Sequence, residues 1–272
     1  MKMRTKGIGH GRAEGVVVQT QMPISFLGGV DPERGCVVEE GSDIRDEPFA
    51  GKILAFPHGK GSTVGSYVIF QLKKAGTAPA AMINQKAEAI VATGAIIAGI
   101  PMLNGIPASI LRSGDRAIVD ADEGMLELPA VFGKVVVTVI AKKDDRILIL
   151  KRSRRVGTFK EHWAGVSGSI LPGEKAAEAA IRELREETGR APSSPNRIIQ
   201  CDPVYARDSG TIWKVHPFLM ELDSDKISLD WEHDEYRWIA PSELTRYQTV
   251  PRLEEVVSSL LKAEAVAEKR IC

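Results

Sequence analysis

Residues 168–189 read GSILPGEKAAEAAIRELREETG, a stretch whose second part predicts one strongly charged helix. Residues three and four apart lie on the same face of a helix, so Glu183, Glu186 and Glu187 should converge. Carboxylates held this closely repel one another in their charged forms unless a counter-charge lies nearby. Two interpretations are open at this point: a solvated face neutralised by the neighbouring arginines, or a set of oxygen ligands for a metal ion.

The residues around these glutamates follow a spaced pattern, G-x5-E-x7-R-E-U-x-E-E-x-G, in which U is aliphatic. The fixed positions are occupied by Gly168, Glu174, Arg182, Glu183, Leu184, Glu186, Glu187 and Gly189. Chance seldom produces agreement at so many positions, and the stretch resembles the Nudix box. Arg190 departs from the pattern, because the box usually closes with an aliphatic residue. Since this position follows the predicted helix end, we expect altered packing and no loss of chemistry.

The resemblance to Nudix proteins extends over about residues 132–265 and includes LKRSRRVGTFKEHWAGVSG, WKVHPFLMEL and WEHDEYRWIAPSEL. It implies an α/β/α sandwich and hydrolysis of a nucleoside diphosphate linked to another group. It also implies that Glu183 is catalytic and that Arg182 orients a glutamate. The implied ligands of Mg²⁺ or Mn²⁺ are Gly168 through its carbonyl, Glu183, Glu186, Glu187 and Glu235. The chemistry agrees, because Mg²⁺ prefers oxygen ligands, bridges substrate phosphates and lowers the pKa of an attacking water.

The acid ligand that is expected from a distant loop has two candidates. Glu232 and Glu235 both lie in the segment WEHDEY, and although Glu235 is carried in the predicted metal set, the sequence does not choose between them. Each of the two also fits a solvated acidic turn. Trp213, Trp231 and Trp238 are interpreted as packing residues rather than as platforms for a nucleobase.

The first half of the chain has a different character, with many glycines and short β-branched runs. The runs are GVVVQT, GCVVEE, KILAFP, AIIAGI and RAIVDAD, and turn signals separate them. One segment, TVGSYVIFQLKKAG, predicts the single good helix, which ends at Gly76. The pattern predicts a compact β/α domain whose last hairpin is DADEGMLELPA. We place the boundary between Pro129 and Lys134, which gives domains 1–131 and 132–272.

The segment FPHGKGSTVGSY, residues 56–67, is the second chemical signal in the sequence. A strand runs into a glycine-rich turn, and a helix is expected to start near Ser62 or Thr63. Backbone N–H groups at such a helix N-terminus suit an anion, and Lys60 adds positive charge. The order of Gly, Lys and Ser does not match a P-loop. On this pattern Ser62 fits two roles, a helix N-cap or a catalytic nucleophile or base.

Several segments of the first half together resemble the small subunits of archaeal phosphomevalonate dehydratases, which belong to the aconitase X group. They are PISFLGGVDPERG, GKILAFPHGKGSTVGSY, AGTAPAAMIN and GAIIAGIPM, and the likeness runs over about residues 5–128. The resemblance implies a swivelling β/α domain like the mobile domain of aconitases. It also implies a heterodimer with a large aconitase-like subunit that carries an iron–sulfur cluster. Cys36, Cys201 and Cys272 are too widely spaced to supply the clustered thiolates of such a site.

The activity that this resemblance implies is the loss of water from (R)-5-phosphomevalonate. The product is trans-anhydromevalonate 5-phosphate, in the archaeal mevalonate pathway of isoprene biosynthesis. Iron in the partner would act on the leaving hydroxyl, and Ser62 would take the proton next to the carboxylate. A serine base needs N–H donors and positive charge that stabilise its alkoxide. Gly59, Lys60 and Gly61 are suited to supply these and to bind substrate, whereas His58 is interpreted as structural.

The composition argues against several other classes. Lys plus Arg equals Asp plus Glu at 36 each, so the chain shows no basic excess for nucleic acid. The polar, glycine-rich start, Met1–Gly15, predicts no signal peptide, and the apolar run AIVATGAIIAGIPML is too short and broken to span a bilayer. The dispersed cysteines argue against a disulfide framework. We therefore expect a cytoplasmic protein without nucleic-acid or membrane partners.

The whole chain is thus predicted to be a natural fusion of a dehydratase small subunit and a Nudix hydrolase domain. Isopentenyl diphosphate or a related prenyl diphosphate would link the two halves as a substrate of the second. Isomerisation is disfavoured, because the isomerase branch of the fold departs from the box present here. One alternative makes the Nudix half a non-catalytic sensor of a nucleotide or prenyl diphosphate, against which the complete glutamate set argues. Another makes the first half a scaffold, against which the loop GKGSTVGS argues.

Overall fold

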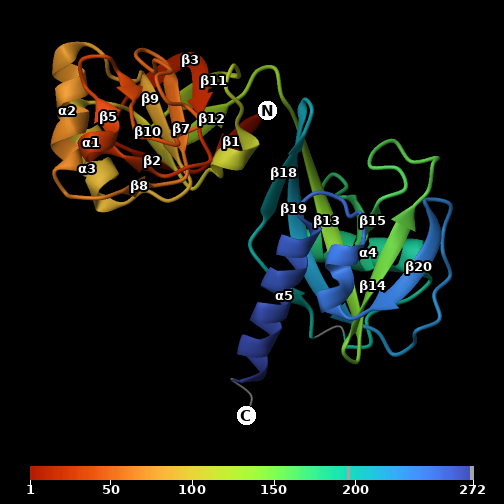
Figure 1. Cartoon of the computed structure of the whole chain (residues 1–272). Coiled ribbons are helices and arrows are strands. Elements are labelled where there is room, and N and C mark those ends of the chain that lie inside the picture. Colours follow the sequence, from red (N-terminus) through yellow and green to blue (C-terminus); the bar gives the residue numbers. More distant parts are fainter. Residues whose placement is uncertain (195–196, 270–272) are drawn as a thin grey trace. The chain divides into compact units, whose positions relative to one another are not determined.

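The computed structural model of this protein describes residues 1–194 and 197–269. Cys272, one of the cysteines considered above, lies outside the described residues together with the end of the predicted second domain. The chain forms two compact units, Met1–Gly133 and Lys134–Cys272 (Figure 1). Both units combine helices with a β-sheet, which confirms the predicted α/β class.

The first unit alternates short strands with short helices. Its strands are β1 (Lys2–Arg4), β2 (Lys6–Ile8), β3 (Arg12–Gln19), β4 (Ile24–Ser25), β5 (Val30–Asp31), β6 (Cys36–Val37), β7 (Ile53–Phe56), β8 (Gly59–Lys60), β9 (Ala81–Asn84), β10 (Met102–Asn104), β11 (Arg116–Asp120) and β12 (Met125–Glu127). Its helical segments are α1 (Phe26–Gly29), α2 (Gly65–Ala75), α3 (Ala89–Ala98) and the 3-10 turn η1 (Ala108–Ile110).

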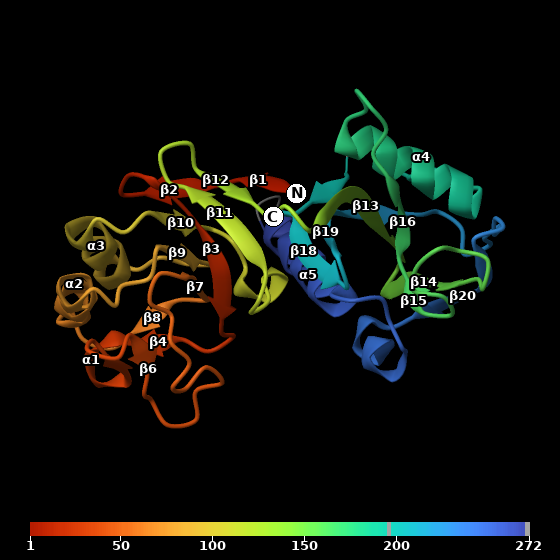
Figure 2. The ribbon, with the colours of Figure 1, turned by 90° about the horizontal axis from the view of Figure 1, so that it is seen from above.

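One sheet forms the centre of the first unit, with the strand order β1-β12-β11-β3-β7-β9-β10-β2. The strands β3, β7, β9 and β10 run parallel, because α2 and α3 carry the chain back after β7 and β9. These two helices lie side by side (Figure 2). Ile69 and Leu72 from α2 and Val91 from α3 share a core with Leu54 and Met82 of the sheet. The loop between β8 and α2 is therefore set on a rigid base.

The helix α2 is present as predicted and ends at Gly76, but it is not the only full helix of this unit. The segment AIIAGI, interpreted above as a β-branched run, contains the end of α3. The cause is close packing between helices, since a Cβ on Gly94 of α3 would lie 2.6 Å from Cδ1 of Ile69 in α2. Tertiary contact here outweighs the local preference of isoleucine for strands.

The second unit also places its helices on an eight-stranded sheet, but its longest strands exceed those of the first unit. Its strands are β13 (Phe132–Lys143), β14 (Arg146–Arg152), β15 (Trp163–Ala164), β16 (Val166–Ser169), β17 (Ile199–Gln200), β18 (Val204–Asp208), β19 (Thr211–Glu221) and β20 (His233–Ile239). Its helices are α4 (Ala176–Thr188) and α5 (Leu253–Glu268), with the 3-10 segment η2 (Pro241–Arg246).

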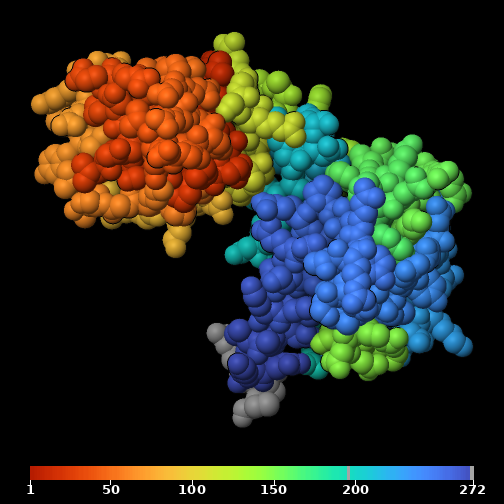
Figure 3. Space-filling model, in the orientation of Figure 1, coloured from red at the N-terminus to blue at the C-terminus, as the bar shows by residue number. Residues whose placement is uncertain are grey.

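The sheet of the second unit lies between α4 and α5. Its order is β15-β14-β13-β19-β17, with β16 beside β13, β18 beside β19 and β20 beside β14. Along β13, Val137 and Val139 share a core with α4, whereas Ile140 shares one with α5. Alternate residues of a strand point to opposite faces, so the two helices cover opposite faces of the sheet (Figure 2). This is the predicted α/β/α sandwich, with α5 visible at its surface in dark blue (Figure 3).

A membrane span requires a helix of sufficient length and hydropathy. Within residues 1–194 and 197–269, none of the helices has the length and hydropathy needed to cross a membrane.

Candidate functional site

Helix α4 carries the candidate metal ligands of the second unit. It begins after Lys175, whose backbone N–H donates to the side chain of Glu178 at 3.0 Å, and it ends at Gly189 in a left-handed conformation. Ala180 and Leu184, on the apolar side of this helix, are fully buried. Burial of this apolar side fixes the rotation of the helix about its axis, and the rotation in turn sets where the glutamates lie.

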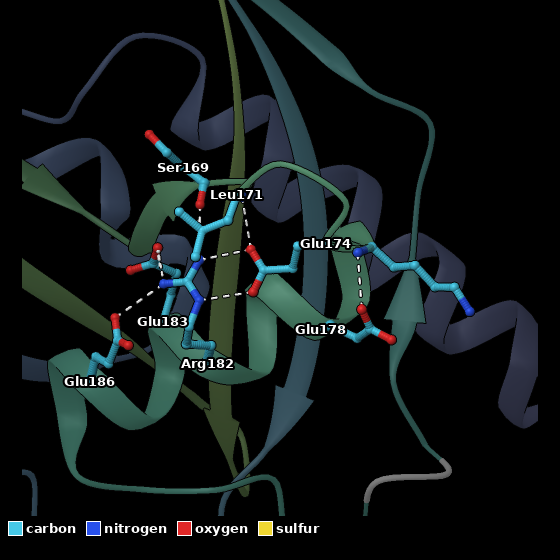
Figure 4. A network of polar contacts seen from close by, with 8 residues as sticks. Ser169, Leu171, Glu174, Glu178, Arg182, Glu183 and Glu186 are labelled. Atoms are coloured by element: carbon cyan, nitrogen blue, oxygen red, sulfur yellow. Dashed lines mark hydrogen bonds and ion pairs between the residues drawn. The ribbon is translucent and has the colours of Figure 1, made fainter.

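Arg182 lies at the centre of the charged side of α4 (Figure 4). Its Nε and Nη2 atoms donate to the two carboxylate oxygens of Glu174 at 2.8 and 3.0 Å, and Nη2 also donates to the carbonyl of Ser169 at 2.9 Å. Its Nη1 atom donates to Glu183 at 2.7 Å and to Glu186 at 3.1 Å. One guanidinium therefore offsets the repulsion among three carboxylates and holds them by charge-assisted hydrogen bonds.

Pairing and burial act in opposite directions on these carboxyl groups. Hydrogen bonds from Arg182 lower the pKa of Glu174 to about 2. Glu183 is more enclosed, and burial raises its pKa even though Arg182 acts to lower it. The backbone at Gly168 approaches Glu183 so closely that a Cβ there would overlap the carboxyl group. Only glycine allows this approach, which brings the predicted carbonyl ligand and the predicted catalytic carboxylate to one place.

Glu187 is the most buried of the glutamates, with 3% of its surface exposed. Its Oε1 atom accepts a hydrogen bond from the backbone N–H of Ser167 at 3.2 Å, whereas its Oε2 atom has no hydrogen-bond partner within the described part of the chain. Burial raises the pKa of Glu187 well above its usual value, and the charge of Glu183 adds to this. A carboxylate oxygen left unpaired in the interior is costly, and a cation would offset that cost.

The structure separates the two candidates for the distal acid. Glu232 lines the same cavity as Glu183, and its negative charge contributes to the raised pKa values of Glu183 and Glu187. Glu235 lies on β20, and its carboxylate pairs with the guanidinium of Arg237 at 2.6 Å. Glu232 therefore shares a cavity with Glu183, whereas Glu235, the residue carried in the predicted metal set, is paired with Arg237.

A cavity of about 660 Å³ opens beside these glutamates. Its walls include the acidic residues Glu183 and Glu232, the basic residues Lys134 and Arg152, and the aromatic residues Phe159 and Trp213. The two aromatic rings have centroids 6.2 Å apart, and Nζ of Lys134 lies 4.8 Å from the centre of the Trp213 ring. The cavity thus joins an oxygen-rich end to an aromatic end, a shape that suits a charged group attached to an apolar one.

The three tryptophans considered in the sequence have different surroundings. Trp213 lines the cavity as well as packing against Phe159. Trp238 packs against the core that α4 shares with the sheet, and its indole nitrogen donates to the carbonyl of Asp225 at 2.8 Å. Trp231 is 55% exposed and lies under the guanidinium of Arg155.

The donor set fits a hard divalent cation, although it is not gathered around one point. Across residues 1–194 and 197–269, no three His, Cys, Asp or Glu side chains are close enough to one another to hold a metal ion. Arg182 supplies the positive charge for Glu183 and Glu186 in this arrangement. The fit rests on the oxygen character of the ligands and on the unpartnered Oε2 atom of Glu187.

The glycine-rich loop of the first unit lies between β8 and α2. Gly61 has φ of +100°, a conformation that side chains disfavour. Ser62 is exposed, and its Oγ atom accepts the backbone N–H of Val64 at 3.3 Å. The helix starts at Gly65, later than the expected Ser62 or Thr63, and Val64 occupies the N-cap position. Ser62 therefore lies in the turn before the helix.

The other residues predicted in this loop are held by neighbours within the same unit. Nζ of Lys60 donates to Oε1 of Glu39 at 2.5 Å, so its charge is already paired. Gly59 is buried, and a Cβ at this position would lie 2.5 Å from Cγ2 of Val91. His58 places Nδ1 3.0 Å from the carbonyl oxygen of Gly59, which supports the structural interpretation of this histidine.

Two residues close to the glutamates were not singled out from the sequence. His233 has a side chain that is 1% exposed, and its Nδ1 lies 3.1 Å from Oδ1 of Asp230. Burial lowers the pKa of His233. A signal was present, because both residues flank the candidate Glu232. The sequence does not show, however, that the start of β20 lies against α4.

Two family models match this chain, the aconitase X swivel domain over residues 2–128 and the NUDIX domain over residues 131–260, which confirms both resemblances. The phosphomevalonate dehydratase small subunit of Thermococcus onnurineus (strain NA1) is 60% identical over 128 residues, covering 47% of this chain and 98% of that protein. The solved holo-form of Thermococcus kodakaraensis aconitase X is 55% identical, with 47% of this chain and 98% of that chain covered and a TM-score of 0.46. The MutT protein of Methanosarcina mazei Go1 is 21% identical, with 50% and 97% covered and a TM-score of 0.43.

Proposed function

The chain belongs, over residues 2–128, to the aconitase X swivel family with its phosphomevalonate dehydratase small subunits, and it continues as a NUDIX domain; from this premise we propose that it joins a dehydratase small subunit to a diphosphate hydrolase. The first activity is the dehydration of (R)-5-phosphomevalonate to trans-anhydromevalonate 5-phosphate. The observation that carries it is the 60% identity over nearly the full length of a relative of that name.

The first unit would act only with a large aconitase-like subunit that holds an iron–sulfur cluster. The role of this chain is to present Ser62, as the base, on a turn whose shape is set by Gly61. Lys60 and the backbone N–H groups of the turn would bind the charged substrate. The paired charge of Glu39 implies that Lys60 exchanges this partner when the complex forms. Copurification with a cysteine-bearing large subunit, followed by detection of the dehydrated product, tests this assignment.

The second unit would hydrolyse a diphosphate with Mg²⁺ or Mn²⁺. The donors are Glu183, Glu186 and Glu187 with the carbonyl of Gly168, and Glu232 takes the place that the sequence left open. A divalent ion held there would neutralise diphosphate charge and lower the pKa of a bound water. Glu183 would accept the proton of the attacking water, because it lines the cavity. The observation that carries the hydrolase assignment is the burial of Glu187, whose Oε2 atom has no hydrogen-bond partner among the described residues, together with the place of Glu183 in the cavity wall.

The cavity supports a substrate with an apolar or flat group beyond its phosphates. The diphosphate would lie at the end formed by Glu183 and Glu232, near Arg152, and the remaining group would lie against Phe159 and Trp213. Prenyl diphosphates and nucleotides both meet this description. A prenyl diphosphate would connect this unit with the first one through isoprenoid metabolism.

A screen that follows both inorganic phosphate and new phosphomonoester products separates hydrolysis from a sensor role, because a prenyl diphosphate releases phosphate whereas a linked nucleoside diphosphate splits into two phosphomonoesters. The purified chain is offered isopentenyl diphosphate, dimethylallyl diphosphate and nucleoside diphosphates linked to a second group, each with Mg²⁺, with Mn²⁺ and with EDTA. Metal-dependent cleavage of one class supports the hydrolase. Tight binding without cleavage of any class identifies the sensor instead.

A further inference from the structure

Two buried polar atoms face each other behind the glutamate helix. Nε2 of His233 and Oε2 of Glu187 lie 3.7 Å apart, with side chains 1% and 4% exposed. Neither atom has a hydrogen-bond partner among the described residues. Buried polar atoms are normally satisfied, so two orphans that point at one another call for a common explanation.

The other side of the histidine ring is fixed. Nδ1 of His233 lies 3.1 Å from Oδ1 of Asp230, which accepts a hydrogen bond from it. The same oxygen accepts the backbone N–H of Glu232 at 3.1 Å. One carboxylate therefore orients both the histidine ring and the residue that carries the distal acid.

The turn that carries these residues is also tied to the neighbouring strand. The backbone N–H of Ser153, just after β14, donates to the carbonyl of Glu232 at 2.7 Å, and Oγ of Ser153 donates to the carbonyl of Trp231 at 3.2 Å. His233 is the first residue of β20 and pairs with Arg152 of β14. The imidazole therefore approaches Glu187 from a rigid part of the sheet.

We propose that Asp230 and His233 form a positioning pair that holds Glu187 and Glu232 in place for a divalent cation. One proton shared between Nε2 of His233 and Oε2 of Glu187 would join these two atoms, since Nδ1 already donates its own proton to Asp230, while Ser167 holds the other oxygen of Glu187 through its backbone N–H. The distance of 3.7 Å is longer than a hydrogen bond, and such contacts tighten when a site fills. The inference rests on the proposed metal-dependent hydrolase, and neither residue of the pair is among those that line the cavity.

The test measures Mn²⁺ binding to the full chain by calorimetry, besides its activity. His233→Leu keeps volume and removes both ring nitrogens, and it should weaken Mn²⁺ binding about 10-fold to 100-fold, as expected when the support of a metal ligand is lost. His233→Gln restores a donor directed at Glu187 and should recover most of that affinity. His216→Leu is the matched control, because His216 is a partly buried histidine on β19 whose Nδ1 also lacks a partner within the described residues. It should leave Mn²⁺ affinity within about 3-fold of wild type, a smaller change than loss of a ligand's support gives.

The outcomes separate this inference from the function on which it rests. Wild-type binding with no loss in His233→Leu overturns the positioning pair and leaves the hydrolase intact. Equal losses in His233→Leu, His233→Gln and His216→Leu show a structural effect and overturn it as well. Absence of Mn²⁺ binding by the wild type overturns both proposals. If His233→Leu does not fold, Asp230→Asn decides: it keeps the shape of the side chain, and unchanged Mn²⁺ affinity in it contradicts the pair.

Discussion

In the first unit the candidate residues lie on an exposed loop, whereas in the second Glu183 and Glu187 lie on the enclosed side of a helix, with Glu186 exposed beside them. Ser62 and Gly61 are exposed, and nothing in their own unit covers the turn that presents them. Glu183 and Glu187 are covered by the strands beside them, and the cavity next to them has walls from one unit only. Under the proposed functions this difference decides which site would need a second chain: a base on an open loop would gain its low-dielectric surroundings from a partner, but an enclosed carboxylate already has them.

The largest effect expected from this comparison is loss of all dehydration in the isolated chain. Supplied with iron and sulfide, the chain alone should not turn over (R)-5-phosphomevalonate, because its three cysteines are far apart in sequence. In the same preparation, the second unit should cleave a diphosphate in the presence of metal at the same rate as it does in the complex. Product analysis of both reactions on one sample checks the contrast. Dehydration, or stable cluster binding, by this chain without a partner would show that the first unit does not need a second subunit.

The next effect concerns Ser62 in the reconstituted complex. Ser62→Ala should lower the rate of dehydration by about 10²-fold to 10⁴-fold, as removal of a general base does. Ser42→Ala is a matched control, because Oγ of Ser42 accepts the N–H of the residue two positions on, Ile44, at 3.4 Å, as Ser62 does with Val64. If Ser62 serves only the turn, both variants should cost at most about 1 kcal/mol of stability and leave the rate near normal. A near-normal rate in Ser62→Ala therefore removes the catalytic assignment.

These contrasts also show what the sequence was able to predict. The box spacing predicted the helix and its glycine end, because helical periodicity and a glycine stop are local properties. The choice between Glu232 and Glu235 depends on where the turn before β20 ends and on which residue of β14 it meets. Strand register is a long-range property, and no local pattern encoded it.

In the first unit, too, long-range packing decided what local patterns could not predict. The second helix α3 was missed because the close approach of Gly94 to Ile69 joins residues that are far apart in sequence. The turn at Ser62 was expected, but the helix began at Gly65, after a hydrogen bond from Val64 that the glycine-rich pattern does not specify. Patterns of residue type predicted the elements, and packing decided their limits.

Replacement of the distal acid should have a smaller effect, on the rate of hydrolysis by the second unit. Glu232→Gln should reduce metal-dependent hydrolysis by on the order of 10-fold to 100-fold, because it removes a charge from the cavity wall. Glu235→Gln is the control of equal chemistry three residues away, and it should mainly release Arg237 from its ion pair. Initial rates at saturating Mg²⁺ for both variants decide between them. The reverse order of effects would restore Glu235 to the metal set.

Mg²⁺ should stabilise the second unit against unfolding and leave the first unit unchanged, an effect smaller than the rate changes above. All four tryptophans, Trp163, Trp213, Trp231 and Trp238, belong to this unit, so tryptophan fluorescence follows its melting within the intact chain. Mg²⁺ at one hundred times its dissociation constant should add about 2.7 kcal/mol to the free energy of unfolding. Glu186→Gln should weaken this gain and hydrolysis together, and leave dehydration by the complex unchanged. A wild-type melting curve that Mg²⁺ does not shift, with no diphosphate cleaved, ends the enzyme interpretation of this unit.

The smallest effect expected is a dependence of metal-free stability on pH that comes from Glu187. Burial raises the pKa of this carboxyl in the folded chain, whereas in the unfolded chain the group ionises at its ordinary value near 4.5. Between these two values the folded state binds more protons than the unfolded state, so the contribution of Glu187 to the free energy of unfolding falls as pH rises.

The same fluorescence melts, run in EDTA from pH 5 to pH 8, measure this contribution as a difference between variants. Glu187→Gln cannot ionise and should lose less stability than wild type as pH rises, whereas Glu254→Gln, at an exposed position of α5, should follow wild type. Subtraction matters because burial lowers the pKa values of His216 and His233, and those groups add stability as pH rises towards their unfolded value. Mg²⁺ should flatten the Glu187 difference, since the ion favours the charged carboxylate at every pH in the range. Wild type and Glu187→Gln with parallel pH profiles would mean that Glu187 is not held in the enclosed, unpaired state on which the contrast between the two units depends.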